Sequence, residues 1–337
     1  MLMSHFCDKR RGQPGERLVS DIAQINRDNL VVMRKNLLES LGGFSETTVQ
    51  NAEWLYMLQE ETRHSVSIEG YFATEQELKA ILTGRKTAAE ILNYYRTAQT
   101  LYDLAVQYAR EEVLRLDMPL VWHVHSELFR ALSERRGAFR RGGIQIQGAK
   151  VRPPEFDVDT YVRAWIQLSL GWLKSLPILA ALARSHALFE SIHPFEDGNG
   201  RAGRILLNWL AVIKGYTPII IKGFTQEERD RYYHALEEAD QGLQPGFPAP
   251  QPAALQKRLE RGDFARLEAL LFEGLSASMD PLIAAALERQ EPLMEFRSLA
   301  PVLNARESTL RQWVHRGKLI AIKRGNRLFS HPRLLLE

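Results

Sequence analysis

Residues 193–204 read HPFEDGNGRAGR, and an apolar stretch over residues 205–213 follows them directly. The tight turn at Gly198, Asn199 and Gly200 leads into what the apolar stretch predicts to be a helix. A glycine-rich turn at a helix N-terminus exposes unpaired N–H groups and the positive end of the helix dipole. The sequence therefore predicts a binding site for an anionic group such as a phosphate.

The charged residues of the same stretch fit chemistry at a phosphate. Arg201 and Arg204 can add charge-assisted hydrogen bonds to phosphate oxygens. Asp197 offers a hard oxygen ligand of the kind that Mg²⁺ prefers, and His193 can accept a proton from a hydroxyl near neutral pH. A helix cap with surface charges and a structural histidine would explain any one of these residues, but not the ordered set. Together they indicate attack of a hydroxyl on a nucleotide phosphate.

The stretch matches the Fic family signature, H-x-F-x-(D/E)-G-N-G-R-x-x-R, at every specified position. The chain resembles that family from about residue 16 to 290, most strongly over 116–240. The resemblance implies a mostly α-helical bundle with a β-hairpin flap, ATP as the substrate, His193 as the general base and Asp197 as the Mg²⁺ ligand. The nucleotide-binding residues that it implies are Phe195, Gly198, Asn199, Gly200, Arg201, Arg204, Tyr232, Tyr233 and Asp240.

A glycine-rich segment over residues 137–154 interrupts the helical pattern. It reads GAFRRGGIQIQGAKVRPP, and its alternating isoleucines predict a short β-hairpin or flap. It resembles the Fic flap, which pairs its backbone with an extended target segment by strand addition. The target-binding residues implied are Gly143, Ile144, Gln145 and Ile146.

The implied adenine pocket departs from the family pattern. Tyr232 and Tyr233, with Asp240, resemble the helix that lines this pocket, but the family often has Asn where this chain has Asp240. The usual Gly-Asp continuation does not follow at 241. Residues 262–275, GDFARLEALLFEGL, resemble it instead, as if the Pro-rich stretch before them were inserted.

Residues 65–70 read SVSIEG and match the pattern (S/T)-x-x-x-E-(G/N) of the inhibitory helix in Fic proteins. By this resemblance Ser65, Glu69 and Gly70 form an N-terminal brake in which Glu69 pairs with Arg204. A carboxylate on Arg204 would remove a γ-phosphate ligand and repel the phosphate. A helix-end glutamate on the surface is the alternative; the position of this pattern ahead of a Fic core favours the brake.

The composition bounds the class of protein. The chain has 337 residues, 45% hydrophobic and 25% charged, which suits a globular protein of two or three domains. One cysteine, Cys7, permits no intramolecular disulfide and fits a reducing compartment. No uninterrupted apolar run approaches the ~18 residues of a membrane span, and the first residues lack the apolar core of a signal peptide. We expect a cytoplasmic protein with no membrane partner.

The last block of the chain is basic. Residues 294–337 contain nine Lys/Arg against three acids. Their pattern predicts a helix-turn-helix and two short strands around Gly325-Asn326, which resembles the winged helix-turn-helix of excisionase and MerR-type proteins. Helix 308–316 would lie in a DNA major groove, with Arg311 and His315 outward. Lys323, Arg324 and Arg327 would lie near phosphates. A packing module without DNA is the alternative.

The predicted organisation has six parts besides the brake motif at 65–70. They are a mobile N-terminus (1–15), an N-terminal helical region (16–115), the Fic core (116–240), a Pro-rich insertion (241–262), a helical extension (263–291) and the winged-helix-like domain (294–337).

The predicted function is AMP transfer from ATP to a Tyr, Thr or Ser hydroxyl of a protein, including the chain itself by auto-AMPylation. Another donor, AMP removal, and a DNA-binding regulator with a nucleotide-sensing core are the alternatives. The target, the residue type modified, the signal that releases the brake and a homodimer stay open.

Overall fold

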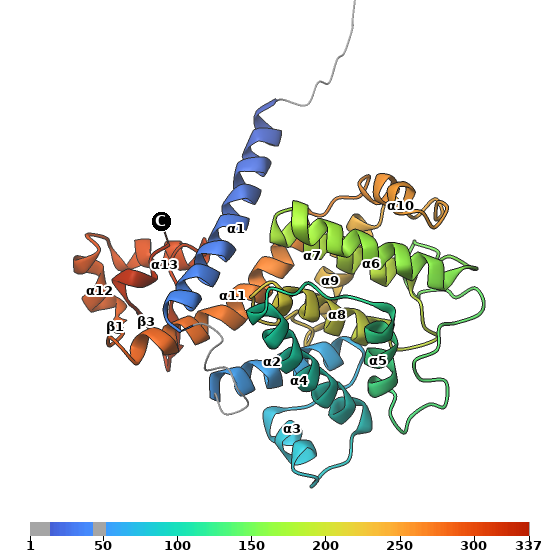
Figure 1. Ribbon diagram of the computed structural model, residues 1–337. Coiled ribbons are helices and arrows are strands. Elements are labelled where there is room, and N and C mark those ends of the chain that lie inside the picture. Colours follow the sequence, from blue (N-terminus) through green and yellow to red (C-terminus); the bar gives the residue numbers. More distant parts are fainter. Residues whose placement is uncertain (1–13, 43–51, 337) are drawn as a thin grey trace, which may run out of the picture.

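The computed structural model describes the backbone of residues 14–42 and 52–336, with side chains from residue 27 onward. Cys7 and most of the predicted mobile N-terminus lie outside the described residues. Thirteen α-helices and a small sheet make up the described part (Figure 1). The helices are α1 (Pro14–Ser40), α2 (Ala52–Ile68), α3 (Glu75–Leu82), α4 (Ala89–Arg110), α5 (Met118–Leu128), α6 (Val158–Ser175), α7 (Ile178–Ile192), α8 (Asn199–Ile213), α9 (Gln226–Ala239), α10 (Pro252–Leu259), α11 (Ala265–Glu288), α12 (Phe296–Val302) and α13 (Glu307–His315).

Reciprocal capping interactions begin two of these helices. The Thr74 side chain accepts a hydrogen bond from the Glu77 N–H, and Glu77 bonds back to the Thr74 backbone, which caps α3. Thr225 and Glu228 form the same reciprocal cap at the start of α9. Each cap satisfies N–H groups that would otherwise lack partners in the first turn.

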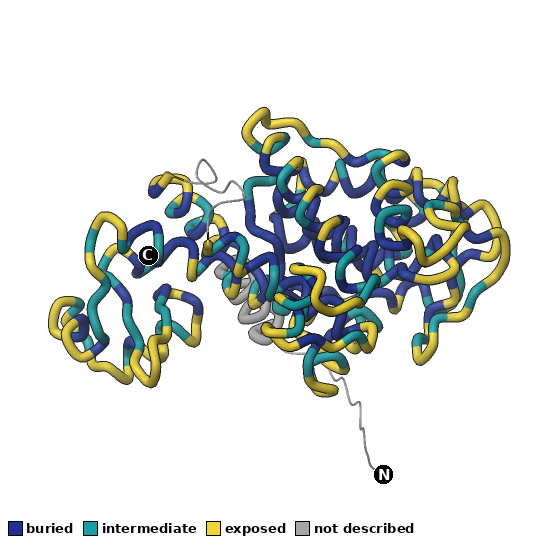
Figure 2. Tube along the Cα trace, turned by 90° about the horizontal axis from the view of Figure 1, so that it is seen from below, coloured by how far each residue is buried: buried dark blue, intermediate teal, exposed yellow. Residues whose placement is uncertain are grey.

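Helix α8, which follows the motif turn, lies at the centre of the fold. Fourteen of its fifteen residues are buried, so this helix must be enclosed on all sides. Helices α2, α4, α5 and α7 pack around it, and the buried part of the chain is concentrated there (Figure 2). The N-terminal turn of α8 therefore has a fixed position relative to α2 and α7.

Helix α11 packs against α1, α2, α7 and α9. Among the described residues it is the one helix long and apolar enough to cross a membrane by length and composition, with 56% of that stretch buried inside the fold. A core helix of a soluble protein passes the same test. Helix α11 packs against four other helices, as a core helix does.

The C-terminal block begins with β1 (Met294–Glu295) and continues through α12 and α13 to β2 (Ile322–Arg324) and β3 (Arg327–Ser330). The strands form an antiparallel sheet in the order β1-β3-β2, with the turn at residues 325–326 as predicted. Arg34 of α1 bonds both Asp280 of α11 and the Gly317 carbonyl, which fastens this block to the helical body.

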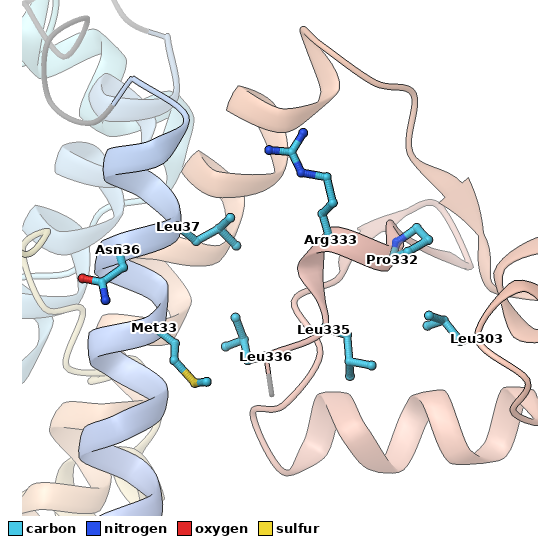
Figure 3. A pocket seen from close by; sticks show the side chains of 8 residues that line it. All are labelled: Met33, Asn36, Leu37, Leu303, Pro332, Arg333, Leu335 and Leu336. Atoms are coloured by element: carbon cyan, nitrogen blue, oxygen red, sulfur yellow. The ribbon is translucent and has the colours of Figure 1, made fainter.

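An apolar cavity remains between α1 and the end of the chain. Its volume is about 480 Å³, and Figure 3 shows Met33 and Leu37 of α1 on one side of it, with Leu335, Leu336 and Leu303 on the other. The C-terminal block thus contacts α1 through the hydrogen bond from Arg34 to the Gly317 carbonyl. The cavity leaves another part of this interface unfilled.

One prediction from the sequence is wrong. The predicted hairpin at 137–154 contains no strand, only turns and irregular backbone. Arg140 bonds the carbonyls of Gly142 and Pro154 on the two sides of the segment, and an isolated hairpin is marginally stable in water. Helix α5 ends at Leu128, where the Asn93 side chain bonds the Leu128 and Arg130 carbonyls and Ala131 turns left-handed at φ 59°.

Candidate active site

Asn199 holds the motif loop in shape. Its side-chain oxygen accepts from the Phe195 N–H at 2.8 Å, and its amide donates to the Phe195 carbonyl at 2.9 Å. The loop then turns at Gly198, whose φ of 75° favours glycine; a Cβ there would also collide with the Phe129 ring. The side chain of Asn199 is therefore committed to the loop, so an anion at this turn would be bound through backbone N–H groups.

The neutral histidine His125 supports this loop through ring stacking and two hydrogen bonds. The His125 ring stacks on Phe195, with centroids 3.8 Å apart. Its Nδ1 accepts from the Gly137 N–H at 2.8 Å, so its Nε2–H donates to the Asp197 carbonyl at 3.1 Å. Burial lowers the pKa of His125 to about 4, so both bonds persist at neutral pH. His125 thereby joins the start of the flap to the motif.

His193 ends α7 in a left-handed conformation with φ 50°. Its Nδ1 lies 3.2 Å from the Glu190 carbonyl. A carbonyl can only accept, so Nδ1 carries the proton and Nε2 is the nitrogen left free as a base. Burial lowers the pKa of His193, opposed by the bond to Glu190 and reinforced by Arg140. The imidazole is therefore neutral under ordinary conditions.

Arg140 is a buried organiser of the site that sequence reasoning missed. Its guanidinium donates to four carbonyls: Ile192 at 3.0 Å and His193 at 2.7 Å at the end of α7, and Pro154 at 2.7 Å and Gly142 at 2.5 Å in the flap. These bonds satisfy carbonyls at a helix C-terminus that would otherwise lack partners. They hold the strained backbone of His193 and fix the base of the flap to it.

We expect Arg140→Leu to lower the free energy of unfolding by about 2–5 kcal/mol, because it leaves several carbonyls without a donor. Urea unfolding followed by circular dichroism measures this. Arg141→Leu is the matched control, because Arg141 is exposed and has no ion pair among the described residues. Equal unfolding midpoints for the two variants would contradict the role given to Arg140.

Arg201 is placed to bind an anion. It is buried in the first turn of α8 and lies over the rings of Tyr71 and Phe129. Its Nε and Nη1 have no hydrogen-bond partner within the described part of the chain. Buried donors without partners are costly, and phosphate oxygens would satisfy them. The structure thus supports the prediction that this turn binds phosphate.

Asp197 fits a magnesium ion that arrives with a nucleotide. Its side chain is 74% exposed, with one oxygen 3.6 Å from Arg201. Across the described ranges no cluster of three or more His, Cys, Asp or Glu side chains could hold a metal by protein ligands alone. Mg²⁺ at nucleotide sites commonly takes one or two carboxylates and completes its shell with phosphates and water. A single accessible carboxylate beside a phosphate site meets that requirement.

The guanidinium of Arg204 is bonded to the end of α2. Nη2 donates to Glu69 Oε1 at 2.7 Å and to the Ser65 carbonyl at 3.1 Å, while Nε donates to the Ser65 hydroxyl at 2.7 Å. Helix α2 ends there, and Gly70 turns away with φ 85°. The contact expected between Glu69 and Arg204 is present, and Ser65 takes part in it.

Two further carboxyl groups lie close to Arg204. Burial raises the pKa of Glu61 and of Glu190 to about 8. Glu61 accepts from the Tyr94 hydroxyl at 2.6 Å and from Asn208 at 3.1 Å, which joins α2, α4 and α8. Both are therefore largely protonated at neutral pH, and Glu69 supplies the carboxylate that neutralises Arg204.

The residues predicted for the adenine pocket differ in accessibility. Tyr232 is buried, and its hydroxyl lies 2.8 Å from Nε2 of His186. Tyr233 is 47% exposed and donates to the Ile68 carbonyl at 3.2 Å. Asp240 is buried, accepts from Gln244 at 2.8 Å, and has its pKa raised by burial to about 6. Of the three, Tyr233 offers the accessible ring, and it touches the last residue of α2.

Two of the four predicted flap residues are exposed. Gly143 and Gln145 are exposed, Ile144 is half-buried, and Ile146 packs against the core. Apart from a turn bond from Ala149 to the Ile146 carbonyl, no backbone bond of residues 143–146 is found in the described chain. This unpaired backbone is available for pairing with another segment.

The basic C-terminal surface is partly neutralised. Arg324 pairs with Glu288 of α11, Arg327 with Glu295 and Arg333 with Glu291. Two of the three side chains predicted near DNA phosphates on the wing are therefore in ion pairs, and Lys323 is exposed. Arg311 and His315 lie exposed on α13, as predicted.

Comparison with known proteins agrees with this geometry. Residues 115–211 match the family described as Fic/DOC. The chain is 29% identical over 288 residues to a probable protein adenylyltransferase of Aquifex aeolicus, covering 80% of this chain and 83% of that protein. It is 29% identical over 185 residues to the protein adenylyltransferase Fic of Drosophila willistoni, but spans only 36% of that longer protein.

Solved structures share the fold. A Fic-domain signaling protein of Bacteroides thetaiotaomicron superposes with a TM-score of 0.59 at 18% identity, over 78% of this chain and 97% of that one. Fic-1 of C. elegans gives 0.56 at 18% identity, over 82% and 76%. The family match begins one residue before the predicted core and ends within α8, so the predicted extension through α9 to residue 240 stays a prediction. Residues 115–211 are therefore similar to the domain described as Fic/DOC.

Proposed function

We propose that this chain is a protein adenylyltransferase that moves AMP from ATP to a hydroxyl side chain of a protein. The observation that carries the proposal is Arg201, a buried arginine with two unpartnered donors in the first turn of α8. Its loop begins at His193, a neutral histidine with Nε2 free. An anion site and a base on one rigid loop suit hydroxyl attack on a phosphate. The names of the relatives from Aquifex aeolicus and Drosophila willistoni favour AMP as the group transferred.

In the proposed reaction, Nε2 of His193 takes the proton of a Tyr, Thr or Ser hydroxyl. The hydroxyl oxygen forms a bond to the α-phosphorus, and the bond from that phosphorus to its bridging oxygen breaks, so that pyrophosphate leaves. The backbone N–H groups at the start of α8 and the Arg201 side chain hold the phosphate oxygens. Mg²⁺, when bound at Asp197, would neutralise phosphate charge.

The resting chain is held off, in this proposal, by α2. Glu69 and Ser65 occupy three donor positions of Arg204. Arg204 is then withheld from the γ-phosphate, and ATP binds weakly or with its α-phosphorus out of line with the attacking oxygen. The chain itself is a substrate of the released enzyme, as proposed for auto-AMPylation. A cytoplasmic location, a homodimer and DNA binding through residues 294–337 remain proposals of lower rank.

Intact-mass spectrometry after incubation with ATP and Mg²⁺ tests the chemistry. Because the proposed brake holds back the wild type, the sample is the Glu69→Gly variant, in which Arg204 is released. The wild type is measured in parallel. The expected gain is one AMP. A gain of one phosphate would show a different transfer from the same fold, and an unchanged mass with measurable ATP binding would favour a nucleotide-sensing regulator.

A further inference from the structure

A second cavity opens beside the motif loop. It measures about 550 Å³ and lies between the chain that follows α5 and the motif residues Glu196 and Asp197. Phe129, Phe139 and the neutral ring of His125 line it with apolar surface. The lining residues include neither Arg201 nor Arg204, which donate to the proposed phosphate site. The cavity therefore borders the reaction centre at Asp197 without containing the phosphate donors.

The cavity is large enough to admit a large side chain, and rings packed on one another form its floor. Phe139 packs on Phe195 with centroids 5.2 Å apart, and Phe195 stacks on His125. These rings are held by the motif loop itself. An apolar group entering from outside would thus meet a preformed surface, which reduces the entropy lost on binding.

The rim and the adjoining flap are strongly basic. Residues 130–152 contain seven Lys/Arg and a single acid, Glu134. Four of the seven are engaged: Arg130 with Glu127, Arg135 with Glu196, Lys150 with Glu237, and Arg140 with carbonyls. Arg136, Arg141 and Arg152 are exposed and have no ion pair among the described side chains. Of these, Arg141 lies on the cavity rim.

We propose that this cavity is a subsite for the protein target, and that it takes an apolar side chain, flanked by acidic residues, from the segment that presents the hydroxyl. Arg141, Arg136 and Arg152 have no ion pair among the described side chains, so their charge favours acidic residues in the target segment. The aromatic floor of the cavity contacts the apolar side chain. The unpaired flap backbone at residues 143–146 can align the same segment. This proposal rests on the proposed function, because that function defines what the target is. Binding of a peptide to the subsite does not require AMP transfer.

Peptide binding to the wild-type chain without ATP tests the subsite. The probe is a fluorescein-labelled 12-residue peptide with a central Tyr and a Phe and two Asp on one side of it, made in both orders. Matched peptides carry Lys in place of Asp, or Ser in place of Phe. Fluorescence polarisation gives Kd, and the Asp-Phe peptide in its better order should bind at least tenfold more tightly than either matched peptide.

Two variants test whether the peptide preference arises in this cavity. Arg141→Glu should weaken the Asp-Phe peptide at least tenfold and favour the Lys peptide instead. Ala138→Leu narrows the cavity with a larger side chain and should reduce the difference between the Phe and Ser peptides. Arg163→Glu, an exposed charge reversal on α6, is the control and should change nothing. Equal binding of all peptides by the wild type, or preferences that persist in Arg141→Glu and Ala138→Leu, would overturn the subsite.

The proposed function is judged separately by the mass gain of one AMP. Loss of AMP transfer in every variant, with the peptide preference intact, would reject the adenylyltransferase and keep the subsite. The reverse result, self-modification with no peptide preference, would keep the enzyme and reject the subsite.

Discussion

Glu69→Gly is expected to raise incorporation of labelled AMP into the chain by about ten- to a hundredfold over the wild type. The reason is the bond from Arg204 Nη2 to Glu69 Oε1 at 2.7 Å, a charge-assisted hydrogen bond of a kind that contributes roughly 1.5–3 kcal/mol, or about one to two factors of ten in an equilibrium. Removing the carboxylate frees Arg204 for the γ-phosphate and removes repulsion from the phosphate site. The measurement is the initial rate of transfer from α-labelled ATP, resolved on a gel.

Two controls separate release of the brake from loosening of the fold. Glu112→Gly makes the same substitution at an exposed turn with φ 55° and should leave the rate unchanged. Glu69→Gln keeps the shape but loses the charge, so its rate should fall between those of wild type and Glu69→Gly. If Glu69→Gly gives no gain while it binds ATP, the pair with Arg204 is structural and the brake is rejected.

His193→Ala in the Glu69→Gly background is expected to lower AMP transfer by about 10²–10⁴-fold, the range for loss of a general base. ATP affinity should change little, because the imidazole bonds the Glu190 carbonyl through Nδ1 and takes no part in the anion site. The measurements are the transfer rate and the Kd for ATP. His123→Ala, an exposed histidine on α5, is the control. A large loss of ATP binding together with the rate would assign His193 to binding.

The pH dependence of the same variant checks the state of the base. Burial lowers the pKa of His193, and the active form is unprotonated. Transfer by Glu69→Gly should therefore stay level as pH falls through the ordinary histidine pKa of about 6.5, and decline only below it. A half-maximal rate at or above that value would contradict the assigned base.

The parts of the site that could be predicted are local in sequence. The motif turn and its helix follow from twelve consecutive residues, and the caps at Thr74 and Thr225 follow from residues three positions apart. The contact of Glu69 with Arg204, 135 positions away, was predicted because a family pattern named both ends. Spacing alone would not have brought them together.

Arg140 shows why the remainder escaped prediction. In the sequence it is one of two adjacent arginines, and nothing in the residue type distinguishes it from Arg141. The structure buries the first among four carbonyls and leaves the second on the surface. That difference comes from the path of the chain between α5 and α6, which has no repeating hydrophobic pattern. In the same segment, the alternation of Ile144 and Ile146 led to a hairpin being predicted where the backbone is irregular.

The position of Glu69 over Gly200 has a wider consequence. A Cβ at Gly200 would collide with the Glu69 carboxylate, so the carboxylate lies directly above the first turn of α8, at the positive end of the helix. In the proposed brake, this carboxylate acts as an internal ligand that competes with the nucleotide phosphate for the same place. Its effective concentration is set by the chain, typically in the millimolar range for short flexible tethers. Anything that frays the last turn of α2, including a ring that displaces Tyr233 from the Ile68 carbonyl, lowers that concentration. By reciprocity, bound nucleotide must then loosen α2 by the same free energy with which α2 weakens the nucleotide.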